Sequence, residues 1–346
     1  MRIALLANPD LTNSTYRAYQ PVMTLARDVH EVRYNQRGRP LTPAEIFGCD
    51  VALIHRIANE EMQQIARGLH EQGIGIVWDN DDDVTAMPKS NPLYAKHGGI
   101  KSRERRAELA KMMRLADVVT TPSAVLADQY RELGARDVRV LENYVPRMFD
   151  RVRPQKHRGI VIACLAGLEH QVDYQRLGLR ETLLQLLDAH PDLRVMSIGL
   201  GLGLPAERYE HIPLVEYADL ARTLSRCDIG IAPIVDIPWN RARSNVKLKE
   251  YASGGLPWLA SPVGPYAAMG EQQGGRLVPD GDWYGALERL IANKRERRKL
   301  AKRAAKWVKG EGIVHHAHRW EAALRDAIAS ASARAGAART PARAGS

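Results

Sequence analysis

Lys247, Glu250 and Tyr251 are spaced three and four positions apart, so a helix would place their side chains on one face. A lysine in the first turn of a helix lies beside backbone N–H groups without helical partners, which suits phosphate binding. A carboxylate one turn further along suits the hydroxyl groups of a sugar. The pattern therefore indicates a site for a ligand that carries both phosphate and sugar, such as a nucleotide sugar.

The residues around this trio predict a short helix with defined ends. Ser244 is placed to cap its first turn, Gly254-Gly255 can form a left-handed end, and Pro257 prevents continuation. The apolar residues 258–260 are typical of a buried strand, and Gly264 opens the next loop. An ordinary capped surface helix before a strand has the same end signals, and it remains the alternative interpretation.

Residues 247–257 resemble the K-x-x-E-[YA]-[MA]-A-x-G-x-P block of GT-B fold glycosyltransferases, especially the family-4-like group. The match includes Glu250, Gly255 and Pro257. In that family the block lies in the C-terminal domain, its glutamate holds the ribose of a nucleotide sugar, and nearby basic residues hold the diphosphate. The resemblance implies that Glu250 contacts the ribose and that Lys247 and a neighbouring arginine, such as Arg241 or Arg243, meet the diphosphate.

The length of 346 residues is sufficient for two α/β domains. Hydrophobic residues make up 45% and charged residues 26%, which is normal for a soluble globular protein. The three cysteines, Cys49, Cys164 and Cys227, are odd in number and widely separated, so they indicate neither a disulfide framework nor a zinc site. We expect a cytoplasmic protein with neither a signal peptide nor a membrane-spanning segment, because no apolar run approaches about 18 residues.

Strand-like and helical segments alternate along the chain, which predicts parallel, doubly wound sheets. With the resemblance, this pattern predicts an α/β protein of the GT-B fold, with two Rossmann-like doubly wound domains facing across a cleft. The predicted strands are residues 2–7, 31–34, 50–55, 75–78, 117–121, 138–141, 159–165, 193–198, 229–234 and 258–260. The predicted parts are an acceptor domain (1–146), a linker (147–158), a donor domain (159–312), a helix that crosses back to the N-terminal domain (313–330) and a disordered tail (331–346).

Loops after strands hold further candidates, because ligands of doubly wound sheets bind beyond the carboxyl ends of strands. Gly167 and His170 lie in a loop that resembles the first phosphate- or sugar-contacting loop of the family's C-terminal domain, although an ordinary strand-to-helix turn is the alternative. Gly199 begins a glycine-rich loop that could flank the base, but it lacks a complete dinucleotide fingerprint. The predicted donor-site residues are Gly167, His170, Gly199, Arg243, Ser244, Asn245, Lys247, Glu250 and Gly264.

Four aspartates, Asp79 and residues 81–83, follow a strand of the first predicted domain. Carboxylates this close repel one another unless a cation, a helix N-terminus or an acceptor compensates. The run resembles the D-x-D-D-[DN] run of some bacterial GT-B enzymes, which implies that Asp81 or Asp82 accepts the proton of the acceptor hydroxyl. With Lys247, which would stabilise the leaving diphosphate, these are the predicted catalytic residues. A metal-binding Asp-x-Asp and a solvated helix start are the alternatives; His55-Arg56 could also line the acceptor side.

Many members of the family have another glutamate eight positions before the one that matches Glu250, and Ala242 stands there in this chain. The retaining stereochemistry usual for family 4 therefore stays open. The resemblance implies transfer of a sugar from a nucleotide diphosphate donor, such as a UDP or GDP sugar, to a glycan, lipid-linked or small-molecule acceptor, without metal or cofactor. The alternatives are a protein of the same fold that only binds a nucleotide sugar or glycan, and a phosphate-cleaving or epimerising enzyme.

The net charge of +10 lies entirely in residues 293–346, which hold 14 Lys and Arg against 4 Asp and Glu. Nine of these basic residues fall within 294–309, where Leu300, Ala304 and Val308 have helical spacing. A solvated surface helix is one interpretation. The other is peripheral contact with an anionic membrane at its inner face, since lipid-linked acceptors are common for this fold. Nucleic acid is the less favoured partner, because no aromatic platform accompanies the charge.

Overall fold

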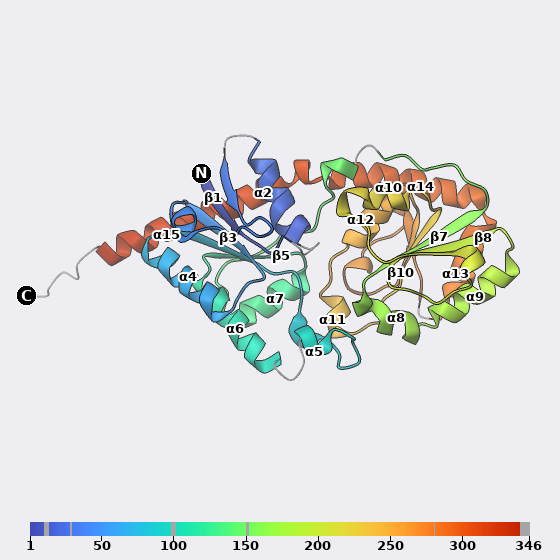
Figure 1. The fold of residues 1–346 in the computed structure, drawn as a ribbon, viewed down its shortest axis with the longest axis horizontal. Helices are drawn as coiled ribbons and strands as arrows, with labels where there is room; N and C mark the ends of the chain where they lie inside the picture. The colour runs from blue at the N-terminus through green and yellow to red at the C-terminus, as the bar shows by residue number, and fades with distance from the viewer. Residues whose placement is uncertain (10–13, 28–29, 98–101, 150–151, 280, 340–346) are drawn as a thin grey trace, which may run out of the picture. The chain divides into compact units, whose positions relative to one another are not determined.

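The computed structural model describes residues 1–9, 14–27, 30–97, 102–149, 152–279 and 281–339, and the chain forms two compact units (Figure 1). Unit 1 comprises Met1–Thr85, Lys101–Asn143 and Ile313–Ser346, and unit 2 comprises Ala86–Ile100 and Tyr144–Gly312. Residues 86–97, which follow the acidic run, therefore belong with the second half of the chain rather than with the predicted first domain.

Unit 1 is built on a six-stranded parallel sheet of order β2-β1-β3-β4-β5-β6. Its strands are β1 (Arg2–Leu6), β2 (Glu31–Tyr34), β3 (Val51–His55), β4 (Gly75–Asp79), β5 (Val118–Thr121) and β6 (Val138–Val140). The central strands β3 and β4 are buried along their whole length, as parallel strands between layers of helices are.

The helices of unit 1 pack against this sheet. They are the π-helix η1 (Thr15–Tyr19), α2 (Gln20–Leu25), α3 (Pro43–Phe47), α4 (Glu60–Glu71), α6 (Ser102–Leu115), α7 (Ala124–Glu132) and α15 (Ala317–Arg339). Ser123 caps α7 by accepting a hydrogen bond from the N–H of Leu126. The long helix α15 crosses β3, β4 and β5 so closely that a Cβ on Gly75 would lie 2.7 Å from the backbone of Ala327.

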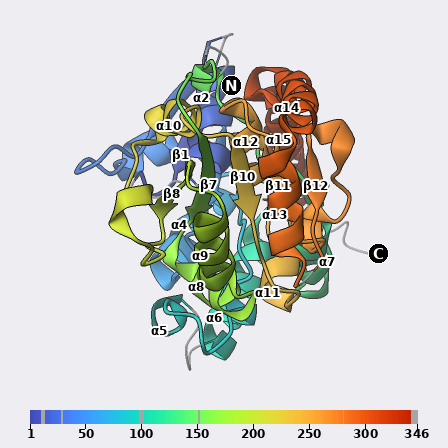
Figure 2. The same ribbon diagram turned by 90° about the vertical axis from the view of Figure 1, so that its right-hand side faces the viewer.

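Unit 2 contains a second six-stranded parallel sheet of order β12-β11-β10-β7-β8-β9, seen at the front of Figure 2. Its strands are β7 (Ile160–Ala166), β8 (Leu193–Gly199), β9 (Tyr209–Ile212), β10 (Ile229–Ala232), β11 (Trp258–Ala260) and β12 (Gly275–Leu277). One apolar cluster joins the sheet to α9 (Leu179–Ala189) and α13 (Trp283–Ala292). Another joins it to α10 (Leu220–Leu224) and α12 (Val246–Ser253), so helices cover both faces of the sheet.

Smaller helices and the basic segment complete unit 2. They are α5 (Tyr94–His97), α8 (Gln171–Arg176), α11 (Pro238–Arg241) and α14 (Lys294–Val308). Short 3-10 turns include η4 (Arg147–Phe149), η5 (Leu168–His170) and η10 (Lys309–Glu311). Among the described residues, no helix combines the length and the apolar character needed to cross a membrane.

Each predicted strand is present, and the two that the sequence did not predict, β9 and β12, form the edges of the second sheet. Both are short and partly exposed, so they lack the apolar run that marks the buried strands. Between β7 and β8 the chain forms two helices, α8 and α9, rather than one, because Gly178 between them is left-handed with φ of 60°.

The prediction of a disordered tail from residue 331 is wrong as far as residue 339, because α15 continues to Arg339. Small side chains let this helix lie close on the sheet: Ala327 and Ala331 are completely buried. Arg334 forms an ion pair with Asp117 at the start of β5. The alanine-rich composition therefore reflects close packing and high helix propensity. Residues 340–346 of the predicted tail lie outside the described residues.

Candidate functional site

Helix α12 has the predicted left-handed end. Gly255 has φ of 84°, and the N–H groups of Gly255 and Leu256 donate to the carbonyl oxygens of Ala252 and Tyr251, both at 3.0 Å. This pair of bonds is a Schellman motif, which satisfies carbonyl groups that a helix end leaves without partners.

The start of α12 differs from the prediction, since Asn245 rather than Ser244 is the N-cap residue. Asn245 has φ of −87° and ψ of 11°, so it lacks the extended conformation in which a cap side chain reaches back to the first turn. Its side chain makes no capping hydrogen bond, and the cap predicted for Ser244 is therefore wrong. The first turn of α12 keeps N–H groups that this cap residue does not occupy, which suits an anionic ligand.

The polar side chains of α12 have different tasks. The hydroxyl of Tyr251 donates to the carbonyl oxygen of Ile231 at 2.6 Å and accepts from the N–H of Leu165 at 2.8 Å, which anchors the helix to β10 and β7. Lys249 is fully buried, with Nζ 2.7 Å from Glu311. Tyr251 therefore anchors the helix rather than serving with Lys247 and Glu250.

Lys247 and Glu250 belong to a cluster of charged side chains in unit 2. Nη2 of Arg243 lies 3.7 Å from Oε1 of Glu169. The same carboxylate oxygen lies 3.9 Å from Nε2 of His170. The charges of Glu169, Arg243 and Glu250 all act on the ammonium group of Lys247, which is half-buried. Four predicted site residues are thus brought together with Glu169, a carboxylate that was not in the predicted set.

Burial lowers the pKa of Lys247 to about 8, and the positive charge of Arg243 contributes to the decrease, although Glu169 and Glu250 oppose it. Burial would raise the pKa of Glu169, but the positive charges of Arg243 and Lys247 contribute to holding it below its ordinary value. Burial, with Lys247 and Arg243 nearby, places the pKa of His170 well below its ordinary value, so this imidazole is neutral at pH 7. The site therefore combines two cationic side chains with an ionised carboxylate.

Buried polar contacts hold this cluster in place. Nδ1 of His170 lies 2.8 Å from Oδ2 of Asp173. The other oxygen of Asp173 accepts from the N–H of Val235 at 3.0 Å and from Nδ2 of Asn240 at 2.7 Å. These bonds fix the segment before α12 to the loop after β7. His170 therefore acts from within the protein, as a link between the two segments.

The arginine next to α12 is positioned by an aromatic ring. The guanidinium carbon of Arg243 lies 4.8 Å from the centre of the Trp239 ring. Arg241, the other arginine candidate, forms a surface ion pair with Asp236 at 2.5 Å. Gly264 has φ of 55°, and a Cβ there would lie 2.9 Å from both Cα and O of Arg241. Only glycine allows this approach, so Gly264 supports the loop that carries Arg243.

The two remaining predicted glycines have local roles. A side chain on Gly167 would collide with the carboxylate of Glu169, so its absence leaves room for that group. Gly199 has φ of 88° and ends β8, where the next N–H, of Leu200, donates to the carbonyl oxygen of Ala166 at 2.6 Å. Contacts of Gly167 with phosphate and of Gly199 with a base remain predictions.

Sequence reasoning missed Glu169, Asp173 and Asn240. Glu169 lies in the loop that was singled out after β7, and Asp173 lies in the first turn of α8, which follows that loop. Their carboxylates, close to His170 in sequence, were an available signal. No local signal could reveal Asn91, whose Nδ2 donates to the carbonyl oxygen of Glu169 at 2.9 Å from 78 positions away. This bond attaches the segment 86–97 to the loop that holds Glu169.

The acidic run in unit 1 is compensated by cations. Asp79 is completely buried, with Oδ2 2.6 Å from Nη2 of Arg17 and Oδ1 2.9 Å from Nδ1 of His55. Asp81 and Asp82 both pair with Arg56. Asp79 and His55 are therefore built into the interior of the unit.

The carboxylate of Asp81 stays ionised beside Arg56. Burial would raise the pKa of Asp81, but Arg56 and His55 hold it below its ordinary value. Arg56 has φ of 64°, a strained conformation for a residue other than glycine. In the described part of the chain, no three or more His, Cys, Asp or Glu side chains are grouped so that they could hold a metal ion.

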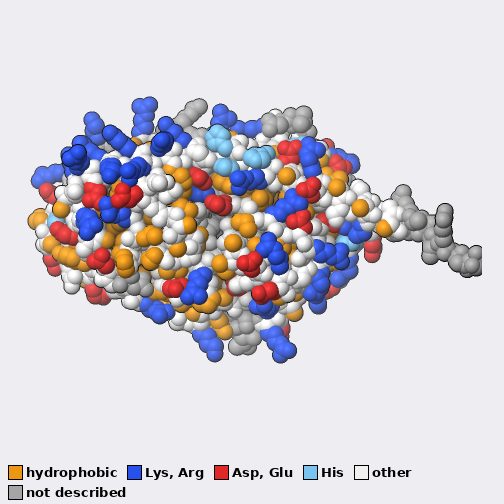
Figure 3. All heavy atoms as spheres, turned by 180° about the vertical axis from the view of Figure 1, so that it is seen from behind, with side chains coloured by type: hydrophobic (Ala, Val, Ile, Leu, Met, Phe, Trp, Pro, Cys, Tyr) orange, Lys and Arg blue, Asp and Glu red, His pale blue; other side chains and the backbone are white. Residues whose placement is uncertain are grey.

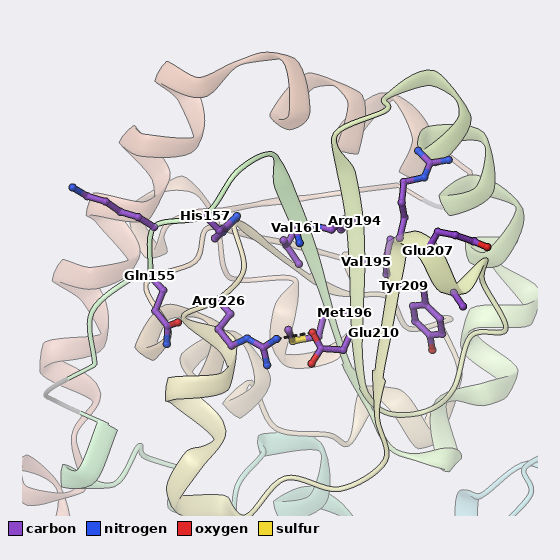
Figure 4. A pocket seen from close by; sticks show the side chains of 13 residues that line it. Gln155, His157, Val161, Arg194, Val195, Met196, Glu207, Tyr209, Glu210 and Arg226 are labelled. Atoms are coloured by element: carbon purple, nitrogen blue, oxygen red, sulfur yellow. Dashed lines mark hydrogen bonds and ion pairs between the residues drawn. The ribbon is translucent and has the colours of Figure 1, made fainter.

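A separate cavity of about 320 Å³ in unit 2 contains none of the predicted site residues (Figure 4). It lies beside the amino ends of β7 and β8, near Val161, Arg194 and Tyr209. Arg226 and Glu210, which also line it, form an ion pair at 2.6 Å. Ligands of parallel α/β sheets bind at the opposite ends of the strands. We therefore place the candidate site at the start of α12 rather than in this cavity.

No protein-family model and no curated protein matches the sequence. Solved structures do match: HepE of Anabaena in complex with UDP-glucose has a TM-score of 0.65 at 13% identity, covering 95% of this chain and 100% of that chain. The chain has the GT-B fold. A putative UDP-N-acetylglucosamine 2-epimerase from Listeria monocytogenes gives a TM-score of 0.57 at 14% identity, over 94% of this chain and 95% of that one. The trehalose-6-phosphate synthase OtsA gives a TM-score of 0.55 at 13% identity, over 80% of this chain and 72% of that one.

Proposed function

We propose that this protein is a glycosyltransferase that transfers a sugar from a nucleotide diphosphate sugar to an acceptor hydroxyl, and that unit 2 binds the donor. The observation that carries the proposal is the arrangement at the start of α12. Arg243 and Lys247 supply positive charge beside a first turn whose N-cap residue, Asn245, makes no side-chain capping hydrogen bond, and the buried Glu250 lies one turn further along.

Each part of this arrangement matches one part of the donor. Two cations and helix N–H groups suit the diphosphate, whose charge increases as its bond to the sugar breaks. The carboxylate of Glu250 suits the ribose hydroxyls, since a charged acceptor forms strong hydrogen bonds with them. Glu169 pairs with Arg243 and partly balances the charge of Lys247 before the donor arrives. The solved structures of HepE with UDP and with UDP-glucose support a UDP sugar as the first donor to test.

In this proposal unit 1 supplies the carboxylates that receive the acceptor's proton. Asp79 is too deeply buried for this task, whereas the side chains of Asp81 and Asp82 are 5% and 15% exposed. Arg56 pairs with both carboxylates, and one of them would accept a hydrogen bond from the acceptor hydroxyl. The charge of the diphosphate would be stabilised by Arg243, Lys247 and the N–H groups at the start of α12, in place of a metal ion.

The second candidate is an epimerase that acts on the nucleotide sugar itself. The likeness to the putative UDP-N-acetylglucosamine 2-epimerase favours it. An epimerase interconverts two nucleotide sugars without an acceptor, whereas a transferase releases nucleoside diphosphate and forms a glycoside. NMR spectra of the purified protein with each nucleotide sugar, with and without an acceptor panel, distinguish the two.

The donor site is tested by substituting Glu250. Glu250→Ala should weaken nucleotide-sugar binding by about 1.5–3 kcal/mol, roughly 10- to 150-fold, because the ribose loses a charged partner. Isothermal titration calorimetry measures the affinity for UDP-glucose and for UDP. Glu207→Ala is the matched control, since it removes an exposed carboxylate from the same unit.

The two variants give a clear decision. The proposal requires that the Glu207 variant keep the wild-type affinity while the Glu250 variant loses affinity and keeps the same thermal unfolding temperature. Equal affinity of a folded Glu250 variant would remove this residue from the site. A wild-type protein that binds no nucleoside diphosphate or nucleotide sugar would overturn the proposed function.

A further inference from the structure

Helix α14 gathers most of its basic residues on one side. At 3.6 residues per turn, five basic residues of α14 and its C-cap residue, Lys309, fall within an arc of about 100° on the helical projection. We call these six the basic stripe: Arg295, Arg298, Lys299, Lys302, Lys306 and Lys309. All six are exposed, and the buried Leu300 and Ala304 project from the opposite side.

Carboxylates on and around α14 are engaged with other arginines. Glu296, the acidic residue of α14, lies 2.8 Å from Arg276. Glu271, whose charge also reaches Lys299, pairs with Arg276 at 2.8 Å and with Arg303 at 2.7 Å. Among the residues that the structure describes, no member of the basic stripe forms an ion pair with a carboxylate. The stripe therefore keeps its full positive charge.

This arrangement works against the stability of the helix. Like charges four positions apart, as in Arg298 and Lys302 or Lys302 and Lys306, destabilise a helix. If this face were only solvated, acidic residues at some of these positions would make the helix more stable. The rest of the chain does balance its charges, with 36 basic and 36 acidic residues outside 293–346. An unpaired, self-repelling row of cations is stabilised by contact with a polyanionic surface.

We propose that the basic stripe is a docking face for an anionic lipid bilayer. From Arg295 to Lys309 the row is about 21 Å long and nearly straight, at about 1.5 Å per residue, so its cations can meet a flat surface together. Figure 3 shows Lys and Arg side chains gathered at the upper left, where α14 runs. The proposal does not depend on the proposed transferase activity, because it concerns the surface of a different helix.

The composition of the stripe sets the mode of contact. No aromatic or large aliphatic residue lies within it, so the helix would lie against the headgroups without inserting. Single-stranded nucleic acid is usually bound with aromatic stacking platforms, which the stripe does not provide. The attraction should be purely electrostatic and should disappear as salt shortens the screening length.

The test is co-sedimentation of the whole protein with phosphatidylcholine vesicles, with and without about 30% phosphatidylglycerol, at about 0.1 M and about 0.5 M salt. We expect binding only to anionic vesicles at the lower salt concentration. The double variant Lys302→Glu/Lys306→Glu should bind at least about 25-fold more weakly, since each basic residue near an anionic leaflet contributes about fivefold.

The matched control is Arg158→Glu/Arg176→Glu, which makes the same change in net charge at exposed positions of unit 2 outside α14. The control should retain vesicle binding, and both variants should keep the wild-type thermal unfolding temperature. If both variants lose vesicle binding equally, the protein is attracted to the bilayer through its overall charge, and the assignment to the basic stripe is overturned. Absence of binding to anionic vesicles at low salt, or stronger binding to duplex DNA at the same salt, would also overturn it.

Discussion

Raising the pH through the pKa of Lys247 should weaken the binding of UDP. Burial and Arg243 lower this pKa to about 8, so the side chain loses its charge at a pH where most lysines remain fully protonated. The diphosphate favours the ammonium form and raises the pKa of Lys247 in the complex. Binding is therefore strongest below pH 8 and weakens as pH rises through the pKa of the free protein.

The magnitude follows from proton linkage. Between the pKa of the free protein and that of the complex, one proton is taken up on binding, and Kd rises by up to tenfold per pH unit. With a free-protein pKa of about 8, Kd should be nearly constant below pH 7 and about 30-fold higher at pH 9.5. The phosphate groups of the ligand, whose second pKa is near 6, are already ionised over this range.

Isothermal titration calorimetry of UDP binding from pH 7 to 9.5 measures this profile. Repeating the titration in buffers of different ionisation enthalpy gives the number of protons taken up on binding. Lys247→Arg is the control, because a guanidinium group keeps its charge over the whole range. It also corrects for titration of the base of the ligand. Parallel profiles for the wild-type protein and Lys247→Arg would refute the assignment of Lys247 to the diphosphate.

Three further predictions concern the metal, the loop and the core. Turnover should continue in the presence of a chelator. If chelation abolishes activity and manganese or magnesium restores it, the acidic run binds a metal ion. Gly264→Ala should destabilise the protein by about 1–3 kcal/mol in chemical unfolding, because alanine is strained at φ of 55°, whereas Gly270→Ala, where a Cβ meets nothing within 4 Å, should change little. Arg17→Met should cost about 3–5 kcal/mol of unfolding free energy by leaving the buried Asp79 without its cation, and a smaller change than about 1 kcal/mol would contradict this role.

The sequence predicted those parts of the molecule that depend on neighbours along the chain. The buried strands were marked by short apolar runs, and the end of α12 was marked by Gly254-Gly255 and Pro257. The spacing of Lys247 and Glu250 also selected two members of the charged cluster. In each case the signal is a backbone preference or a helical period, which a few consecutive residues are sufficient to express.

Edge strands and helix starts were less predictable. β9 and β12 are held by pairing with one neighbour, so their own sequences carry little apolar pattern. The choice of Asn245 over Ser244 as the N-cap depends on the path of the chain into α12. Alanines at the end of α15 are helical because a glycine of β4 allows close packing, a fact that lies outside the segment itself.

The tertiary structure alone decided which charges meet. Glu169 reaches Arg243 from a loop 74 positions earlier in the sequence, and Arg17 neutralises Asp79 from 62 positions away. Such pairs form because a parallel sheet brings the carboxyl ends of its strands to one edge, where loops that are distant in sequence become neighbours. Burial then makes these pairs obligatory, because a charge removed from water requires a partner. The residue types were present in the sequence, but their pairing and the pKa of Lys247 follow from the packed fold.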